Sequence, residues 1–83
     1  MSARGPYARY APLRGTQSAL VGYLRRGDWQ GVVEALAGVL GRPVGNVWLA
    51  VAALDARGLI TARRLDDGTV RLRLTKSGRS IRL

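Results

Sequence analysis

Cysteine and histidine are both absent from this 83-residue chain. Their absence excludes disulfides and removes the usual ligands of zinc and iron–sulfur sites. It also removes the central residue of most nucleophilic and acid–base arrangements in enzymes. The acidic residues are scattered and offer no paired-carboxylate site: Asp28, Glu34, Asp55, Asp66 and Asp67. We therefore expect a protein that is not an enzyme, with no catalytic residue, no metal site and no cofactor.

Long apolar runs are lacking as well. A membrane span needs about eighteen or more apolar residues, and the longest run here, Val47–Leu54, is far shorter. The N-terminal segment is basic but has no apolar stretch of the kind that secretory signals carry. These absences predict a cytoplasmic protein that does not span a membrane.

Acidic residues are few relative to basic ones. Fourteen Lys and Arg stand against five Asp and Glu, which gives a formal net charge of +9 and a sequence pI near 11.7. So strong an imbalance implies a polyanionic partner, with nucleic acid as the first candidate and an anionic membrane surface as the second. The alternative is that the charge only keeps the protein soluble.

Two helices are predicted in the first half of the chain. Thr16 is a good N-cap for the first helix, which we expect to end near Arg26. Asp28 is placed to cap the second helix, which we expect to begin near Trp29 and to carry apolar residues on one face. Residues 41–43, Gly-Arg-Pro, then break the pattern, and proline suits the beginning of a new helix.

A third helix is predicted after this break, ending at Gly58, because glycine is a typical left-handed helix terminator. Its inward stripe is expected to consist of Val44, Val47, Val51 and Leu54. Two short helices joined by a glycine-containing turn predict a helix-turn-helix within residues 31–60.

A β-hairpin is predicted after the third helix. Two extended segments, 59–65 and 69–75, flank Asp66-Asp67-Gly68, and Asp-Gly between extended segments is a strong hairpin signal. Apolar residues and arginines alternate in the second segment, so one face should pack on the core and the other should carry guanidinium groups. Residues 76–83 are then a short basic tail without room for another long helix.

Residues 1–15 have no helical or strand period, and we expect them to form a mobile basic arm ahead of a single domain at 16–83. One interpretation places the arm along a phosphate backbone or in a minor groove, with its charges at Arg4, Arg9 and Arg14. The other is a disordered tail, or a strap that packs Leu13 and two tyrosines on the core.

The segment ALDARGLITARR, residues 53–64, resembles the end of the recognition helix and the first wing strand of MarR-type and related winged helix regulators. Their pattern is roughly L-E-x-x-G-L-I-x-R. The segment RLRLTKSGR, residues 71–79, is similar to the second wing strand and the L-T-x-x-G-R that follows it. The resemblance implies an α+β winged helix-turn-helix, with three helices followed by a two-stranded hairpin wing. It also implies a prokaryotic, dimeric, DNA-binding transcription regulator whose third helix enters the major groove.

The outward face of the predicted third helix is poor in hydrogen-bonding groups. It presents Gly45, Leu49 and three alanines, with Trp48 on one flank and Asn46 on the other. Direct recognition of bases needs Arg, Lys, Asn or Gln side chains, and only Asn46 and the preceding Arg42 qualify. The face therefore either enters a DNA groove while arginines elsewhere hold phosphates, or forms an interface with another protein chain.

Our leading hypothesis is a double-stranded DNA-binding protein, a transcription regulator or chromosome-organising factor. We expect a homodimer at the nucleoid, with no membrane partner and no small-molecule substrate. The candidate phosphate-binding residues are Arg63, Arg64, Arg71, Arg73, Lys76 and Arg79, and the candidates near the bases are Arg42 and Asn46. The alternative is a protein-interaction winged helix that docks or dimerises through Trp48, Leu49 and Ala52. RNA binding is a third possibility, although the sequence offers no stacking platform for single strands.

Overall fold

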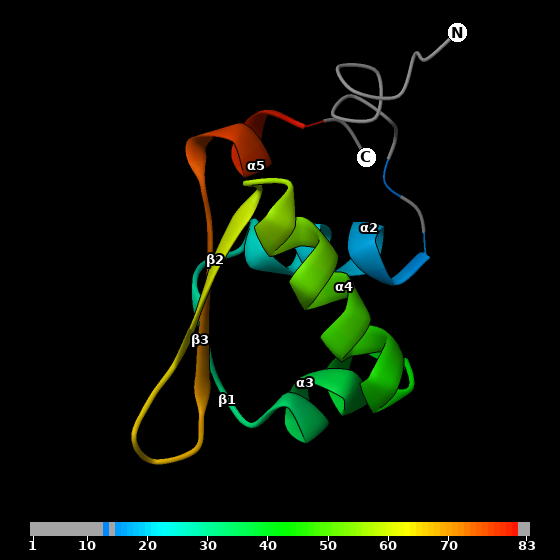
Figure 1. Cartoon of the computed structure of the whole chain (residues 1–83). Coiled ribbons are helices and arrows are strands. Elements are labelled where there is room, and N and C mark those ends of the chain that lie inside the picture. The colour runs from blue at the N-terminus through cyan, green and yellow to red at the C-terminus, as the bar shows by residue number, and fades with distance from the viewer. Residues whose placement is uncertain (1–12, 14, 82–83) are drawn as a thin grey trace, which may run out of the picture.

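The computed structural model describes residue 13 and residues 15–81. Within this part of the chain the elements are, in order, α2 (Gly15–Leu24), β1 (Trp29–Gly31), α3 (Val33–Leu40), α4 (Val44–Ala56), β2 (Ile60–Arg64), β3 (Val70–Leu74) and α5 (Lys76–Ser80). The expected α+β class is confirmed, with one short helix and one strand more than predicted. The short helix α5 lies at the end of the sheet opposite the hairpin loop (Figure 1).

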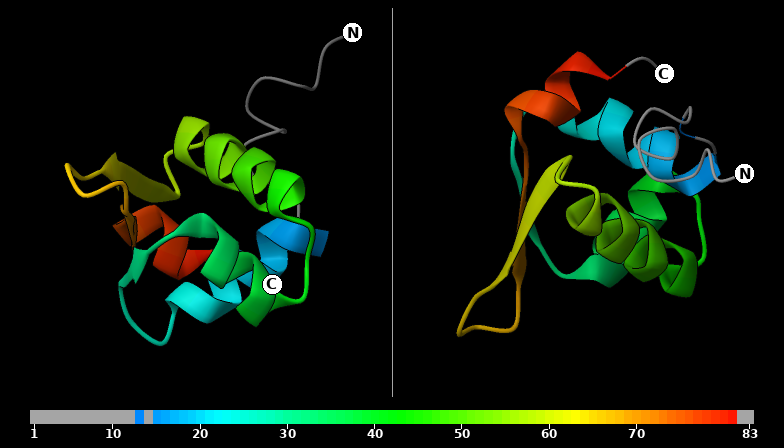
Figure 2. Two further views of the ribbon diagram at one scale, coloured as in Figure 1. Left: turned by 90° about the horizontal axis from the view of Figure 1, so that it is seen from below. Right: turned by 45° about the horizontal axis from the view of Figure 1, so that its top comes forward.

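The sheet is antiparallel with the strand order β1-β3-β2, so β3 lies at its centre. Along β3, buried Val70, Leu72 and Leu74 alternate with exposed Arg71 and Arg73. Two turned views place α2, α3 and α4 on one side of the sheet (Figure 2). The apolar face of β3 therefore packs on the helices and its arginines face away from them, as the alternation predicts.

Strand β1 replaces the predicted beginning of the second helix. Trp29 pairs with Leu72 of β3, and α3 begins only at Val33, so the helix start at Trp29 and the capping role of Asp28 are both wrong. The physical reason is that β3 has backbone groups on a second edge, and a short extended segment satisfies them. The ring of Trp29 packs at the rim of the core and covers Gly31.

Helix α2 keeps close to its predicted bounds. It begins at Gly15, one residue before the predicted cap. Thr16 therefore lies in the first turn of the helix, and the prediction that it is the N-cap is wrong. Past Leu24, the last helical residue, the Arg25 N–H still donates to the Val21 carbonyl at 3.0 Å. The chain therefore leaves the helix gradually, near the expected end.

Helices α3 and α4 form the predicted helix-turn-helix. Gly41 ends α3 with a φ of +66°, and the following Arg42 N–H donates to the Ala37 carbonyl at 3.1 Å, an arrangement that favours glycine. Pro43 is the N-cap of α4. Within residues 15–81 no single helix is long and apolar enough to cross a membrane; α3 and α4 meet that test only as a pair, bent by 101°.

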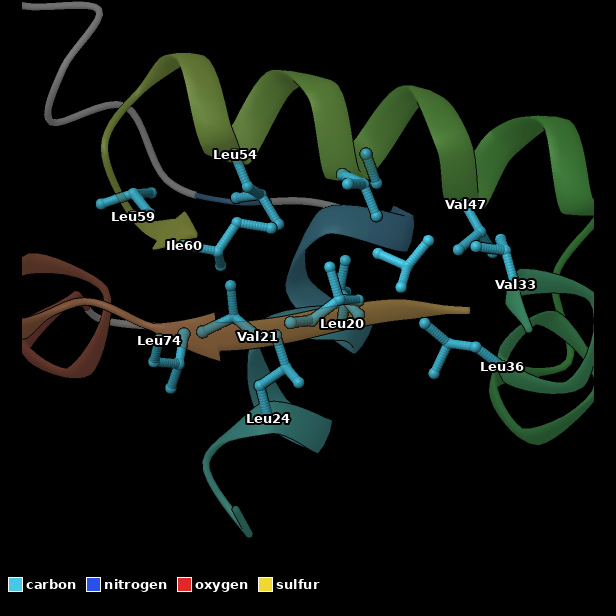
Figure 3. Close-up of a cluster of buried hydrophobic side chains, with 14 of the residues drawn as sticks. Leu20, Val21, Leu24, Val33, Leu36, Val47, Leu54, Leu59, Ile60 and Leu74 are labelled. Atoms are coloured by element: carbon cyan, nitrogen blue, oxygen red, sulfur yellow. The ribbon is translucent and has the colours of Figure 1, made fainter. Parts of the chain in front are cut away.

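One hydrophobic core joins the helices to the sheet (Figure 3). Its largest fully buried side chains come from both layers: Leu20, Val21, Leu36, Val47, Leu54, Ile60 and Leu72. Each such side chain contributes about 1.5–3 kcal/mol relative to an exposed one. Leu13 is also buried in this core, whereas residues 1–12 and 14 of the predicted arm, with Arg4, Arg9 and Arg14, lie outside the described residues.

The inward stripe of α4 differs from the predicted one at its first position. Val47, Val51 and Leu54 are buried as predicted, but Val44 is 39% exposed and Ala50 is buried in addition. Val44 is the first residue of the helix, and the elements that cover the later turns do not reach it.

Hydrogen bonds of Thr75 join the two ends of the hairpin. The Thr75 N–H donates to the Leu59 carbonyl at 3.0 Å, and its hydroxyl donates to the Gly58 carbonyl at 2.7 Å and accepts from the Gly78 N–H at 3.0 Å. A Cβ at Gly78 would lie 2.0 Å from the Leu59 carbonyl oxygen. Two residues of the L-T-x-x-G-R segment are thus explained by packing and hydrogen bonding alone.

The substitution Gly78→Ala should destabilise the fold, because the new methyl group overlaps the Leu59 carbonyl oxygen. This oxygen cannot move without breaking its hydrogen bond to the Thr75 N–H. We expect a loss of about 1–3 kcal/mol in the free energy of unfolding, the usual range for overpacking. The matched control is Gly38→Ala, at an exposed position in α3 where a Cβ meets nothing within 4 Å. This substitution should stabilise the protein by up to about 1 kcal/mol. Urea unfolding of both variants measures the difference, and equal stabilities would contradict the proposed overlap.

Candidate nucleic-acid interface

Helix α4 exposes a face that is almost uncharged. Leu49 is 71% exposed and Trp48 36% exposed, and the nearby Ala52 and Ala56 are exposed too. Asp55, near the C-terminal end, is the one charged residue in the helix. The face is therefore smooth and apolar, as the sequence predicts, and any attraction to an anion must come from residues around it.

Arg64 supplies such a charge at the edge of this face. Its guanidinium carbon lies 5.2 Å from the centroid of the Trp48 ring, a cation–π contact worth about 0.5–1 kcal/mol at an exposed site. In the β2–β3 register Arg64 is opposite Val70, a core-facing residue, so Arg64 is on the side of the sheet that faces α4. The contact ties the hairpin to the helix.

Arg42 and Asn46 are both exposed and lie near the N-terminal end of α4. No side chain caps this end, since the N-cap is Pro43. Asn46 borders a shallow, open pocket of about 400 Å³ between α2 and α4, which is lined by Thr16, Gln17, Asn46, Leu49, Ala50 and Ala53. By the helical period, Asn46 and Trp48 lie on opposite flanks of the exposed helix face.

Arg63, Arg71 and Arg73 lie on the other side of the sheet. Arg63 is directly opposite Arg71 in the register, and both strands alternate so that these side chains face away from the helices. Arg71 donates from Nε and Nη2 to Gln30 Oε1 at 3.3 and 3.1 Å. Arg73 Nε lies 3.0 Å from Asp28 Oδ2 in an exposed ion pair.

The partners Asp28 and Gln30 were not predicted from the sequence. Both belong to the β1 region, whose position beside β3 depends on tertiary pairing and leaves no local signal in so short a segment. The pairing of Gln30 with Arg71 in the register brings their side chains to the same face of the sheet.

Lys76 and Arg79 occupy a third place, on the exposed surface of α5. This helix lies at the end of the sheet opposite the hairpin loop (Figure 1). The eight candidate residues therefore do not form one surface. The first group lies in or beside α4 and consists of Arg42, Asn46 and Arg64. The second group is the three arginines on the outer face of the sheet, and the third is the two cations on α5.

The hairpin loop is acidic at its tip. The carboxylate of Asp67 accepts hydrogen bonds from the Thr69 hydroxyl at 2.6 Å and from the Thr69 N–H at 2.9 Å. These bonds, chiefly the one from the hydroxyl, favour the charged form and hold the pKa of Asp67 below its ordinary value. Gly68 completes the turn with a φ of +86°. Asp67 therefore organises the loop and carries a negative charge at neutral pH.

The substitution Thr69→Val should raise the pKa of Asp67 toward its ordinary value, because it removes the hydroxyl donor and keeps the side-chain shape. Since the pKa is lowered in the folded state, the hydrogen bonds stabilise the loop fully above the ordinary aspartate pKa. This stabilisation disappears as the pH falls through the lowered value. NMR titration of the Asp67 carboxyl carbon measures the shift. Thr61→Val, in an exposed position near the other end of β2, is the control that should leave it unchanged; an unchanged pKa in Thr69→Val would contradict this account.

The comparisons with known proteins bear on the fold. No protein-family model matches the chain, and no curated protein matches it significantly. Among solved structures the chain is similar to "The complex structure of hsRosR-S4", with a TM-score of 0.66 and 21% sequence identity. The match covers 86% of this chain but 65% of that one, so the chain spans about two thirds of the length of its solved neighbour. The similarity shows that this chain has the winged helix-turn-helix fold.

Proposed function

We propose that the protein binds double-stranded DNA through α4 and the adjoining hairpin, as a transcription regulator or a chromosome-organising factor and not as an enzyme. The observation that carries the proposal is the contact between Arg64 and Trp48, which holds a cation at the border of an exposed helix face. The net charge of +9 supports a polyanionic partner. The winged helix-turn-helix fold, shared with the solved RosR structure, supports the same function by analogy.

The chemistry of α4 favours binding to the phosphate backbone over reading of the sequence. Its exposed alanines are small enough for close approach to a groove, and Leu49 can contact a thymine methyl group. Asn46 alone offers a bidentate amide within the helix, and Arg42 stands beside the N-terminal end, where the helix dipole attracts phosphate. Affinity should therefore depend strongly on salt and only weakly on sequence.

The acidic loop sets a limit on how the hairpin contacts DNA. Asp66 and Asp67 repel phosphates, so the loop should stay out of the minor groove, and the stem residue Arg64 should make the contact instead.

We further propose that the protein acts at the nucleoid, in the cytoplasm of a prokaryote, as the resemblance to prokaryotic regulators implies. One small module grips weakly, so we propose that it acts as a homodimer.

The double substitution Arg42→Gln/Arg64→Gln should weaken binding to all duplex sequences alike. Two lost phosphate contacts should lower the slope of log affinity against log salt concentration by about 2, since each contact contributes about 0.9. Fluorescence anisotropy with two unrelated duplexes at several salt concentrations measures both quantities. Arg26→Gln, an exposed cation in the turn after α2, is the control. A wild-type affinity that does not change with salt would rule out the proposed binding mode.

A second candidate function is self-association through α4, and the exposure of Leu49 and Trp48 favours it. The substitution Leu49→Arg separates the two functions. If α4 enters a DNA groove, an added cation should strengthen duplex binding and steepen the salt dependence by about 1. If α4 is a dimer interface, the same charge should convert a dimer to a monomer in sedimentation velocity and leave the fold intact. Ser77→Arg, an exposed position on α5, controls for the added charge alone.

A further inference from the structure

The outer face of the sheet carries a row of polar side chains that crosses all three strands. Gln30 of β1, Arg71 of β3 and Arg63 of β2 are aligned in register, and Arg73 lies two residues further along β3. All four are exposed. The row faces away from α2, α3 and α4, so it is separate from the face on which Arg64 contacts Trp48.

The row is unfavourable for the isolated protein. Like charges directly opposite each other on neighbouring strands destabilise a sheet, and Arg63 and Arg71 are such a pair. Gln30 orients the Arg71 guanidinium without neutralising it. Among the residues that the structure describes, one carboxylate, that of Asp28, forms an ion pair on this face, and it pairs with Arg73. Three guanidinium groups are thus arranged with a single compensating charge.

The shape and charge of this face select the kind of partner. A second copy of the chain would bring the same positive row and would be repelled. The outer surface of a sheet is open, so it suits an extended ligand with repeated charges better than a small anion. Neighbouring strands lie about 4.8 Å apart and alternate residues along a strand about 6.7 Å apart. The three guanidinium groups therefore offer donors over a span that more than one phosphate of a duplex can meet.

We propose that the outer face of the sheet binds a second segment of duplex DNA while α4 holds the first, so that the protein bridges two duplexes. This inference rests on the proposed DNA binding through α4. It assigns Arg63, Arg71 and Arg73 to a second DNA-binding surface. The activity of the protein would then be chromosome organisation through the bridging of two duplexes.

A two-duplex capture assay with the full chain tests the proposal. One biotinylated duplex is fixed on beads, the protein is added, and recovery of a second, fluorescent duplex of unrelated sequence is measured. Arg63→Gln/Arg71→Gln should lower recovery at least tenfold while changing the affinity for a single duplex less than threefold. Arg42→Gln/Arg64→Gln should lower recovery of the second duplex and also weaken the affinity for a single duplex. Arg63→Lys/Arg71→Lys, which keeps the charge, and Thr61→Gln, an uncharged change on the same face, should both retain bridging.

Each other result overturns a defined part of the proposal. Wild-type protein that binds one duplex but recovers no second one rules out bridging and leaves DNA binding through α4 intact. Bridging that survives Arg63→Gln/Arg71→Gln assigns the second site elsewhere, such as a dimer partner, and rules out the outer face. If that variant loses single-duplex affinity as strongly as Arg42→Gln/Arg64→Gln, the two faces are one surface and the inference is wrong. Absence of any duplex binding by the wild type rejects the proposed function itself.

Discussion

The central strand β3 is the constraint on which the arrangement of the molecule depends. It pairs on both edges, and its alternation buries Val70, Leu72 and Leu74 against the helices. A slip of one residue would exchange buried leucines for arginines, so the register is strongly fixed. The same register sets the direction of the neighbouring strands, which puts Arg64 on the α4 side and Arg63 on the outer side. The positions of the surface charges are thus a consequence of core packing.

Local signals explain how much of the fold could be predicted from the sequence. Helix α4 and the hairpin were predicted because Pro43, Gly58 and Asp67-Gly68 are chemically specific boundary signals that act through their neighbours in the chain. Strand β1 could not be predicted, because three residues have no detectable period and become a strand only when β3 is beside them. The preceding aspartate at position 28 resembles a helix cap in sequence, but in the fold it lies beside Arg73.

The candidate site divides in the same way. Composition predicts an anionic partner, which stays a prediction, whereas the helical period was enough to predict that the exposed face of α4 is apolar. How the arginines divide between faces was beyond the sequence, because two adjacent residues, Arg63 and Arg64, point to opposite sides of the sheet only once the register is known. The contact of Trp48 with Arg64 was also missed, since it joins two elements whose relative position is set by the core. This contact shows that Arg64 packs on the ring of Trp48, whereas the sequence predicted only that the ring is exposed.

For the DNA binding that we propose, the acidic loop and the basic stem of the hairpin also affect how the protein approaches a duplex, before any contact forms. Negative charge at Asp66 and Asp67 and positive charge along the stem make the hairpin an electric dipole, and a dipole experiences a torque in the field of a polyanion. Approaching a duplex, the protein would be turned with its loop outward and its stem inward. Such pre-orientation raises the fraction of productive collisions without adding binding energy. The two aspartates, which make no favourable contact with a phosphate, would then act on the rate of association.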